Sequence, residues 1–442
     1  MWHLTAQPNL CLRDPLKFKP LFLLVFVLLL GCSSSFVSER PAKNSPPSPT
    51  SLLLVPGQMP LPQSIKGVEF FRKGYPGNPA VIRLGSSDRV VLQFDELSSI
   101  SGQFSVKFTH HNKNWEPSSL ADIWLFDGVN QLTIQGGQLN RFSQPRYYHY
   151  EFEFPNRNLS FLSSGNYMMH VFDFQSGVEL FSLPFFVTEN EGTFEPYSET
   201  VFNSGQYGAA EDQLYGEFLY PEFVQFPQFD LSYVLVQNRF LNQVKSPEHT
   251  NFLKEGSTTF RLTRNQLFPA YFDFNLLDLE PLSLQNPQIY EYQRGVVPER
   301  VYLKPDYFNF STVANNGQQN GLGQPAPSRD AKYVNVYFSF EGGGTITSNE
   351  EVYLIGDFTQ WSVDPKYKLN YNAESTRFET NVLIKEGSYS YKYVTVQNGR
   401  INTLYLSERI SSQPQEYMAF VYYRDPQYHF DRLLNVKLFY SE

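Results

Sequence analysis

The chain is poor in cysteine, in long apolar runs and in clustered charge. Its only two cysteines are Cys11 and Cys32, and Cys11 falls in an N-terminal segment that we expect to be removed, so disulfides and cysteine-based metal sites are excluded from the mature chain. No apolar run after Cys32 reaches membrane-spanning length. The formal net charge is −9 without a block of like charges, which argues against a nucleic-acid partner.

The N-terminal segment has the pattern of a bacterial lipoprotein signal. Lys17 and Lys19 precede an unbroken apolar run from Leu21 to Leu30, and Gly31 and Cys32 follow it. The run is too short for a permanent membrane helix and suits a signal-peptide core. We therefore expect residues 1–31 to be a signal peptide and Cys32 to be the site of lipid attachment. The alternative is a plain secretory signal in which Cys32 is incidental.

Aromatic residues dominate what is present. The chain has 40 Phe and 29 Tyr against 5 Met, together with 30 Pro, a balance that favours strands and turns over helices. Alternating segments such as Val90, Leu92 and Phe94 are typical of half-buried antiparallel strands. We predict an all-β chain of tandem immunoglobulin-like or early-set β-sandwiches behind the signal and a flexible tether.

Changes in composition along the chain predict its organisation. The expected parts are a signal peptide (1–31), a Ser/Pro-rich tether (32–60), an N-terminal β-sandwich of about seven strands (61–189), a middle β-rich domain (190–312), a Gly/Asn/Pro linker or loop (313–329) and a C-terminal early-set-like β-sandwich (330–442).

No motif for catalysis stands out. The sequence contains no Gly-x-Ser-x-Gly elbow, no His-Glu-x-x-His and no glycine-rich phosphate loop before a helix. His110 and His111 could supply imidazole ligands, but adjacent strand residues point to opposite faces and cannot share a metal without a bend. We predict a protein that is not an enzyme and has no cofactor or metal, with a hydrolase as a distant alternative.

Several segments, in order, carry a resemblance to a known family. They cover nearly the whole mature chain and include Val81 to Leu97, Asn114 to Ser118, Phe154 to Asn156, Ser164 to Tyr167, Val236 to Arg239, Val352 to Phe358 and Lys385 to Tyr393. In these segments the chain resembles the plug protein family of the type 9 secretion system of Bacteroidota, formerly a domain of unknown function. His110-His111-Asn112 departs from the pattern of the family.

The resemblance implies a non-enzymatic lipoprotein that is attached to the outer membrane and faces the periplasm. Its expected partners are the outer-membrane translocon barrel, whose periplasmic opening it would plug, and associated secretion components.

A second resemblance is confined to the C-terminal region. Val352 to Phe358 with Trp361 is similar to the start of glycogen-binding modules of the early-set type, in which exposed tryptophans stack on sugar rings. The candidate glycan residues of this region are Trp361, Tyr367 and Tyr371, and Trp115 of the first domain completes the candidate partner or glycan surface. A glycan-binding lipoprotein of a polysaccharide-capture system is the alternative function, although one tryptophan is a poor glycan platform and a fold does not fix function.

Overall fold

The computed structural model describes residues 52–202, 209–308, 327–342, 346–347, 349–407 and 411–441. All of them belong to one compact unit, Pro46–Glu442. Antiparallel sheets account for almost all of its regular structure, so the predicted all-β fold is confirmed. Cys32 and the first part of the predicted tether lie outside the described residues.

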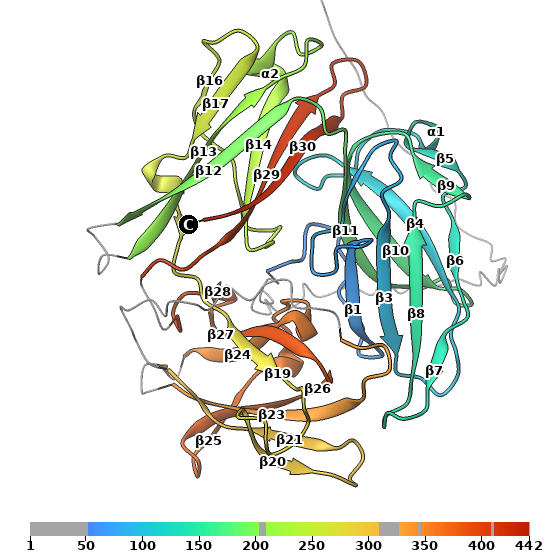
Figure 1. Ribbon diagram of the computed structural model, residues 1–442, viewed down its shortest axis with the longest axis vertical. Helices are drawn as coiled ribbons and strands as arrows, with labels where there is room; N and C mark the ends of the chain where they lie inside the picture. The colour runs from blue at the N-terminus through green and yellow to red at the C-terminus, as the bar shows by residue number, and fades with distance from the viewer. Residues whose placement is uncertain are drawn as a thin grey trace, which may run out of the picture. The chain divides into compact units, whose positions relative to one another are not determined.

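The first sandwich packs two sheets around an aromatic core, within residues 65–189, all of which are described (Figure 1). One sheet has the order β1 (Ile65–Arg72), β3 (Val90–Glu96), β8 (Tyr147–Phe154) and β7 (Gln138–Asn140). The other has the order β2 (Val81–Arg83), β11 (Glu179–Thr188), β10 (Gly165–Asp173), β4 (Phe104–His111) and β6 (Leu132–Ile134). A short helix α1 (Asp122–Leu125) precedes the small pair β5 (Phe126–Gly128) and β9 (Leu159–Phe161). The two sheets thus hold more strands than the seven expected.

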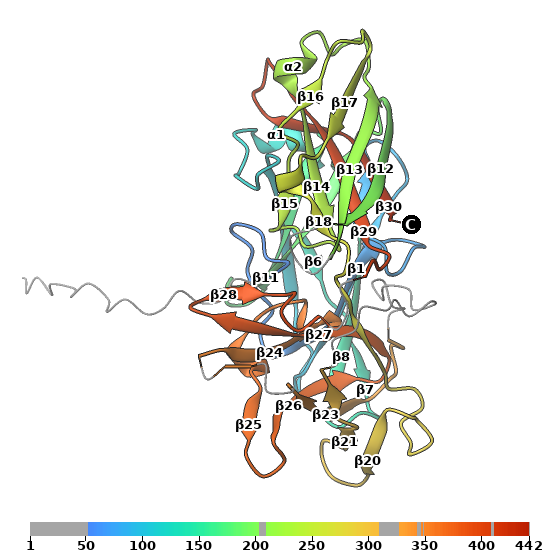
Figure 2. The same ribbon diagram turned by 90° about the vertical axis from the view of Figure 1, so that its left-hand side faces the viewer.

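The middle sandwich is assembled from distant parts of the sequence. Its first sheet contains β12 (Thr193–Phe202), β13 (Ala210–Leu219), β17 (Ser257–Arg261), β16 (Thr250–Asn251) and β18 (Phe268–Pro269). Its second sheet has the order β15 (Val244–Lys245), β14 (Leu231–Gln237), β29 (Glu416–Arg424) and β30 (Asp431–Tyr440), and helix α2 (Pro227–Asp230) leads into β14. In Figures 1 and 2 the red β29 and β30 lie beside the green β14, although about 180 residues separate them in sequence.

The third sandwich takes strands from both sides of residues 309–326. One sheet contains β19 (Asn275–Asp278), β27 (Ser388–Gln397), β24 (Glu351–Gly356) and β28 (Arg400–Asn402). The other contains β20 (Ile289–Gln293), β21 (Arg300–Leu303), β23 (Tyr333–Glu341), β26 (Arg377–Lys385), β25 (Asn370–Asn372) and β22 (Asp306–Tyr307). Three one-turn 3₁₀ segments complete the regular structure of the described residues, namely η1 (Arg264–Gln266), η2 (Asp357–Thr359) and η3 (Pro365–Tyr367).

Two predicted boundaries are therefore wrong. Residues 275–307 belong to the third sandwich rather than to a middle domain that ends at 312, and residues 416–440 belong to the middle sandwich rather than to the C-terminal one. Local alternation identifies a strand, but the choice of partner strand depends on long-range pairing that the pattern does not encode.

The predicted tether also ends earlier than expected. Leu52 is fully buried and its backbone N–H donates to the carbonyl of Trp361, while Val55 packs between the first and middle sandwiches. The stretch from Leu52 to Pro60 is thus part of the folded unit, because its leucines and valine bury apolar surface that a free tether would expose.

Candidate functional site

Three of the four residues in the predicted partner or glycan surface are buried. Trp115, Trp361 and Tyr367 are 6%, 4% and 5% exposed, and only Tyr371 is open to solvent, at 58%. Trp115 packs between the first and middle sandwiches against Phe186, and Trp361 packs against Phe240 and Phe274. A ring with both faces covered cannot stack on a sugar, so the interpretation of these three residues as binding residues is wrong.

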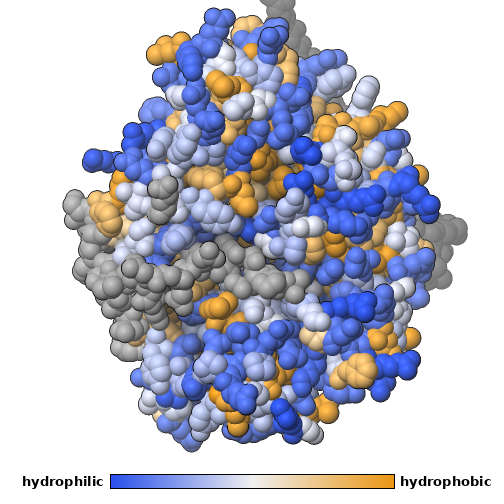
Figure 3. Space-filling model, in the orientation of Figure 1, coloured by the Kyte–Doolittle hydropathy of each residue, from blue (hydrophilic) through white to orange (hydrophobic). Residues whose placement is uncertain are grey.

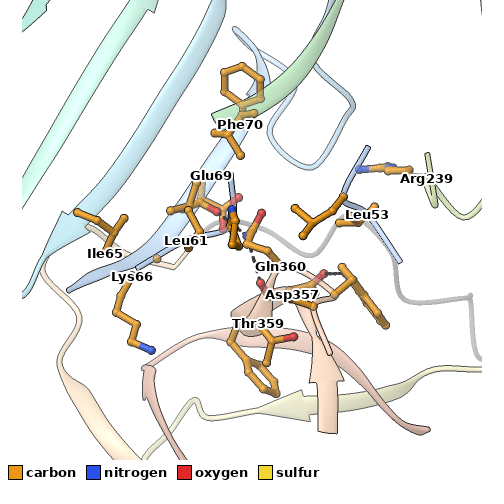
Figure 4. Close-up of a pocket in the computed structure, with 18 of the residues that line it drawn as sticks. Leu53, Leu61, Ile65, Lys66, Glu69, Phe70, Arg239, Asp357, Thr359 and Gln360 are labelled. Carbon is orange, nitrogen blue, oxygen red and sulfur yellow. Dashed lines mark hydrogen bonds between the residues drawn. The ribbon is translucent and has the colours of Figure 1, made fainter. Parts of the chain in front are cut away.

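A cavity of about 270 Å³ lies where the first and third sandwiches meet the segment that begins at Leu52. Its wall is mainly apolar, and Figure 4 shows Leu53, Leu61, Ile65 and Phe70 around it. Strand β1 of the first sandwich and the 3₁₀ turn η2 of the third supply the carboxyl groups of Glu69 and Asp357. Arg239, Leu241 and Met418 of the middle sandwich also line it, so the cavity lies where all three sandwiches meet.

A β-bulge directs the charged residues of β1 into this cavity. The pairing of β1 with β3 shifts between Lys66 and Glu69, and Gly67 between them has a φ of +53°. A Cβ on Gly67 would lie 3.0 Å from both Asp95 Oδ2 and the Tyr333 hydroxyl, so the position requires glycine for its backbone angle and for this close approach. Because the bulge breaks strict alternation, Lys66 and Glu69 both line the cavity.

The carboxyl group of Glu69 has no hydrogen-bond or ion-pair partner in the described part of the chain. Burial is the main cause that raises the pKa of Glu69 to about 8, the nearby Asp357 raises it further, and Lys385 opposes both. The free protein therefore holds this carboxyl largely protonated at neutral pH.

Asp357 faces the same junction from η2, but it has partners. Its carboxylate accepts hydrogen bonds from the Ser390 backbone N–H at 2.7 Å and from the Trp361 indole N–H at 3.0 Å. Burial nevertheless raises the pKa of Asp357 to about 6. Gln360 ties η2 to β1, since its side-chain amide donates to the carbonyl of Val68 at 3.1 Å.

Among the described residues, the cations around the cavity also divide into those with a carboxylate partner and one without. Arg239 pairs with Glu416 and donates to the carbonyl of Gly77, and Lys385 pairs with Asp95 at 2.8 Å. Burial lowers the pKa of Lys66 to about 8, with Lys366 acting in the same direction and Asp364 against it. In Figure 4 the ammonium group of Lys66 points away from Glu69.

A second feature is an exposed apolar surface at one end of the first and middle sandwiches, which we call the end surface. It comprises Ile123, Trp124, Leu162, Phe223, Phe226, Phe229 and Tyr428. The ring of Trp124 in α1 packs on Tyr428 in the β29–β30 turn, with 5.6 Å between ring centroids. The ring of Phe223 packs on Tyr423 of β29, with 5.5 Å between centroids. Apolar side chains are visible near α1 in Figure 3. Large aromatic residues on loops at one end of a molecule are typical of a protein-binding surface.

Little in the described residues suggests chemistry. They contain no group of three His, Cys, Asp or Glu side chains that could hold a metal ion. The imidazole of His110 bonds within the fold, since its Nε2–H donates to the carbonyl of Ser164 and its Nδ1 bonds to the Ser118 hydroxyl. Burial lowers the pKa of His110 to about 4. No helix in the described part of the chain is long and apolar enough to cross a bilayer.

Comparison with known proteins identifies the first sandwich. Residues 65–189 match the family model of the type 9 secretion system plug protein 1st domain, and this range runs from the first residue of β1 to the residue after β11. The first sandwich is thus similar to the first domain of type 9 secretion system plug proteins. The match covers the segments from Val81 to Tyr167 that carry the sequence resemblance, and the matched family is a secretion-system family rather than an enzyme family.

Solved structures support the fold. A hypothetical protein from Parabacteroides merdae ATCC 43184 aligns with a TM-score of 0.78 and 23% identity over 87% of this chain and 99% of its own. The C-terminal domain of the Streptococcus agalactiae AgI/II polypeptide BspA aligns over 85% of this chain and 98% of its own, at 10% identity and a TM-score of 0.16 that carries no structural argument. No curated protein matches the chain. The three-sandwich architecture is thus shared with the Parabacteroides protein.

The sequence contains one signal for the cavity. An isolated glycine inside an alternating strand, here Gly67 between Lys66 and Val68, is typical of a bulge. The contribution of η2 has no such signal, because Asp357 lies near Glu69 only through packing of two sandwiches.

Proposed function

We propose that this protein is a non-enzymatic component of the type 9 secretion system that binds the outer-membrane translocon barrel and plugs its periplasmic opening. Lipid on Cys32 holds it at the outer membrane, facing the periplasm. The match of residues 65–189 to the plug-protein domain carries this proposal.

The end surface is the part of the molecule that we assign to the translocon. Its aromatic residues come from the first and middle sandwiches together, and Trp124 and Phe229 are 55% and 78% exposed. Burial of such side chains by a partner contributes much of the binding energy in protein interfaces. The two sandwiches are fixed to each other by a bidentate pair between Arg432 and Glu189, with N–O distances of 2.8 and 2.6 Å, so the surface is preorganised.

Affinity purification from detergent-solubilised outer membranes tests the proposal. Wild-type protein should recover the translocon barrel, and a Trp124→Glu/Phe229→Glu variant should recover at least tenfold less. Tyr290→Glu is the matched control, since Tyr290 is 71% exposed on the third sandwich. Failure of the wild type to recover any secretion component would refute the function, whereas equal recovery by all variants would refute only the assigned surface.

Plugging itself predicts a leak. Cells that lack the protein should admit a small hydrophilic dye through the outer membrane faster than wild-type cells, because the barrel would stay open. Unchanged dye uptake, with the barrel still present, would leave a translocon-binding protein that does not act as a plug.

A further inference from the structure

The carboxyl group of Glu69 lines the cavity without a hydrogen-bond partner among the described residues. It is half-buried and has no ion pair with another described residue, although the backbone of Glu69 pairs with Gln93 of β3. A carboxyl group that leaves bulk water without such a partner is unfavourable. Asp357, Arg239 and Lys385 at the same junction are each held by a bond to a neighbour. Lys366 and Asp364 pair with each other, and the ammonium group of Lys66 points away from Glu69 (Figure 4). Titratable groups without a partner in a cavity are concentrated at binding sites.

The surroundings of Glu69 indicate which kind of ligand group could pair with its carboxyl group. Leu53, Leu61 and Ile65 offer an apolar channel of limited volume beside the carboxyl group (Figure 4). The side-chain amide nitrogen of Gln360 donates to the carbonyls of Val68 and Asp357, which leaves its oxygen as a further acceptor at the junction. An ammonium group has three donors and no acceptor, so two carboxylate oxygens and an amide oxygen match it well.

We propose that this cavity binds an aliphatic chain ending in a primary ammonium group, with Glu69 as its counter-ion. The chain lies along the leucines, and the ammonium donates to Glu69. The same chemistry occurs in a free alkylamine and in a lysine side chain of a peptide. An anionic or uncharged ligand of similar length would leave the carboxyl group unpaired.

Calorimetry with the full mature chain and n-hexylammonium chloride tests the proposal, with n-hexanol as the uncharged ligand of matched length. Hexylammonium should bind at least tenfold more tightly than hexanol at pH 8.5. Because pairing requires ionised Glu69, whose pKa in the free protein is about 8, affinity should fall close to tenfold per pH unit from pH 7.5 to pH 6.5. Lys66, Lys385 and Asp357 also act on this site, so the variants below isolate Glu69.

Glu69→Gln should weaken hexylammonium binding at least tenfold and remove its pH dependence. Glu151→Gln is the control, because Glu151 is exposed on β8 of the same sandwich. Both variants should retain the far-UV circular dichroism spectrum of the wild type. Equal binding of hexanol and hexylammonium, wild-type affinity in Glu69→Gln, or no binding of either ligand would overturn the proposal.

A capped Leu-Lys-Leu peptide distinguishes the two sources of the ammonium group. Competition with hexylammonium would identify a lysine side chain as the ligand. Lack of competition, with hexylammonium still bound through Glu69, would identify a free amine.

Discussion

Asp95 of β3 joins the first and third sandwiches through one buried carboxylate. It accepts hydrogen bonds from Lys385 and Tyr333, both of the third sandwich, at 2.8 Å, and contacts His149 Nδ1 at 2.7 Å. Asp95 is fully buried and the side chain of Lys385 is 4% exposed. Desolvation makes such a pair weak as a net source of stability, but removal of one partner leaves an uncompensated buried charge.

Asp95→Asn should therefore lower the free energy of unfolding by about 3 kcal/mol, the magnitude found when a buried pair is broken. Urea denaturation of the full chain measures the change. Asp127→Asn, an exposed carboxylate of the same sandwich, should stay within about 0.5 kcal/mol of wild type. Adding Lys385→Met to Asp95→Asn should restore part of the loss, and a single variant as stable as the control would contradict the role of the pair.

Glu69 gives the stability of the protein a pH dependence. Its pKa is about 8 in the folded state and 4.5 in the reference state, so between these values the folded protein binds a proton that the unfolded chain has released. As far as Glu69 is concerned, the free energy of unfolding is highest below about pH 4.5. It falls as the pH rises to about 8, by at most roughly 1.4 kcal/mol per pH unit. Asp357, with a folded pKa of about 6, adds a loss of the same sign at lower pH.

Glu69→Gln should remove the larger part of this loss. Its melting temperature should fall less than that of wild type between pH 6 and pH 8, because the amide that replaces the carboxyl group has no proton to release. Glu151→Gln should follow the wild-type curve. Parallel curves for wild type and Glu69→Gln would show that the carboxyl is not buried in the folded protein.

At the scale of elements, alternation predicted many strands well. Val90, Leu92 and Phe94 all point into the core of the first sandwich from β3, and Tyr148 to Phe154 lie in β8. Trp115 and Trp361 lie in turns outside the strands, where alternation gives no information, so it could not reveal that packing between sandwiches covers them. For this reason the strands were predictable, whereas the binding role given to these tryptophans was wrong.

The segment from Leu52 to Pro60 shows the same limit, because its Ser/Pro-rich surroundings concealed two core residues. Leu52→Ala should lower the free energy of unfolding by about 2 to 5 kcal/mol, as expected for a fully buried leucine. Leu253→Ala is the control, since Leu253 is 93% exposed and should change stability by less than about 0.5 kcal/mol. Equal urea midpoints for the two variants would mean that the segment is a tether after all.

At the scale of the whole molecule, the order of strands in sequence differs from their order in space. The middle sandwich combines β14 with β29 and β30, and β29 pairs with β14 over seven residue pairs from Leu231 to Gln237. Gln415, just before β29, donates to the carbonyls of Ala270 and Phe272 and accepts from Asn238. Predicting such pairings requires information about which distant segments meet, and hydrophobic periodicity carries none.

Isolated fragments should therefore differ sharply in their ability to fold. Fragment 65–189 contains both sheets and the core of the first sandwich, so it should show a dispersed nuclear magnetic resonance spectrum and a cooperative thermal transition. Fragment 190–312 lacks β29 and β30, which supply Tyr417, Ala419, Val421 and Leu434 to the core of the middle sandwich. Without them β14 has an unpaired edge and an uncovered apolar face, so this fragment should be unfolded or aggregated. A cooperative transition in fragment 190–312 alone would show that the C-terminal hairpin adds to a middle domain that is already complete.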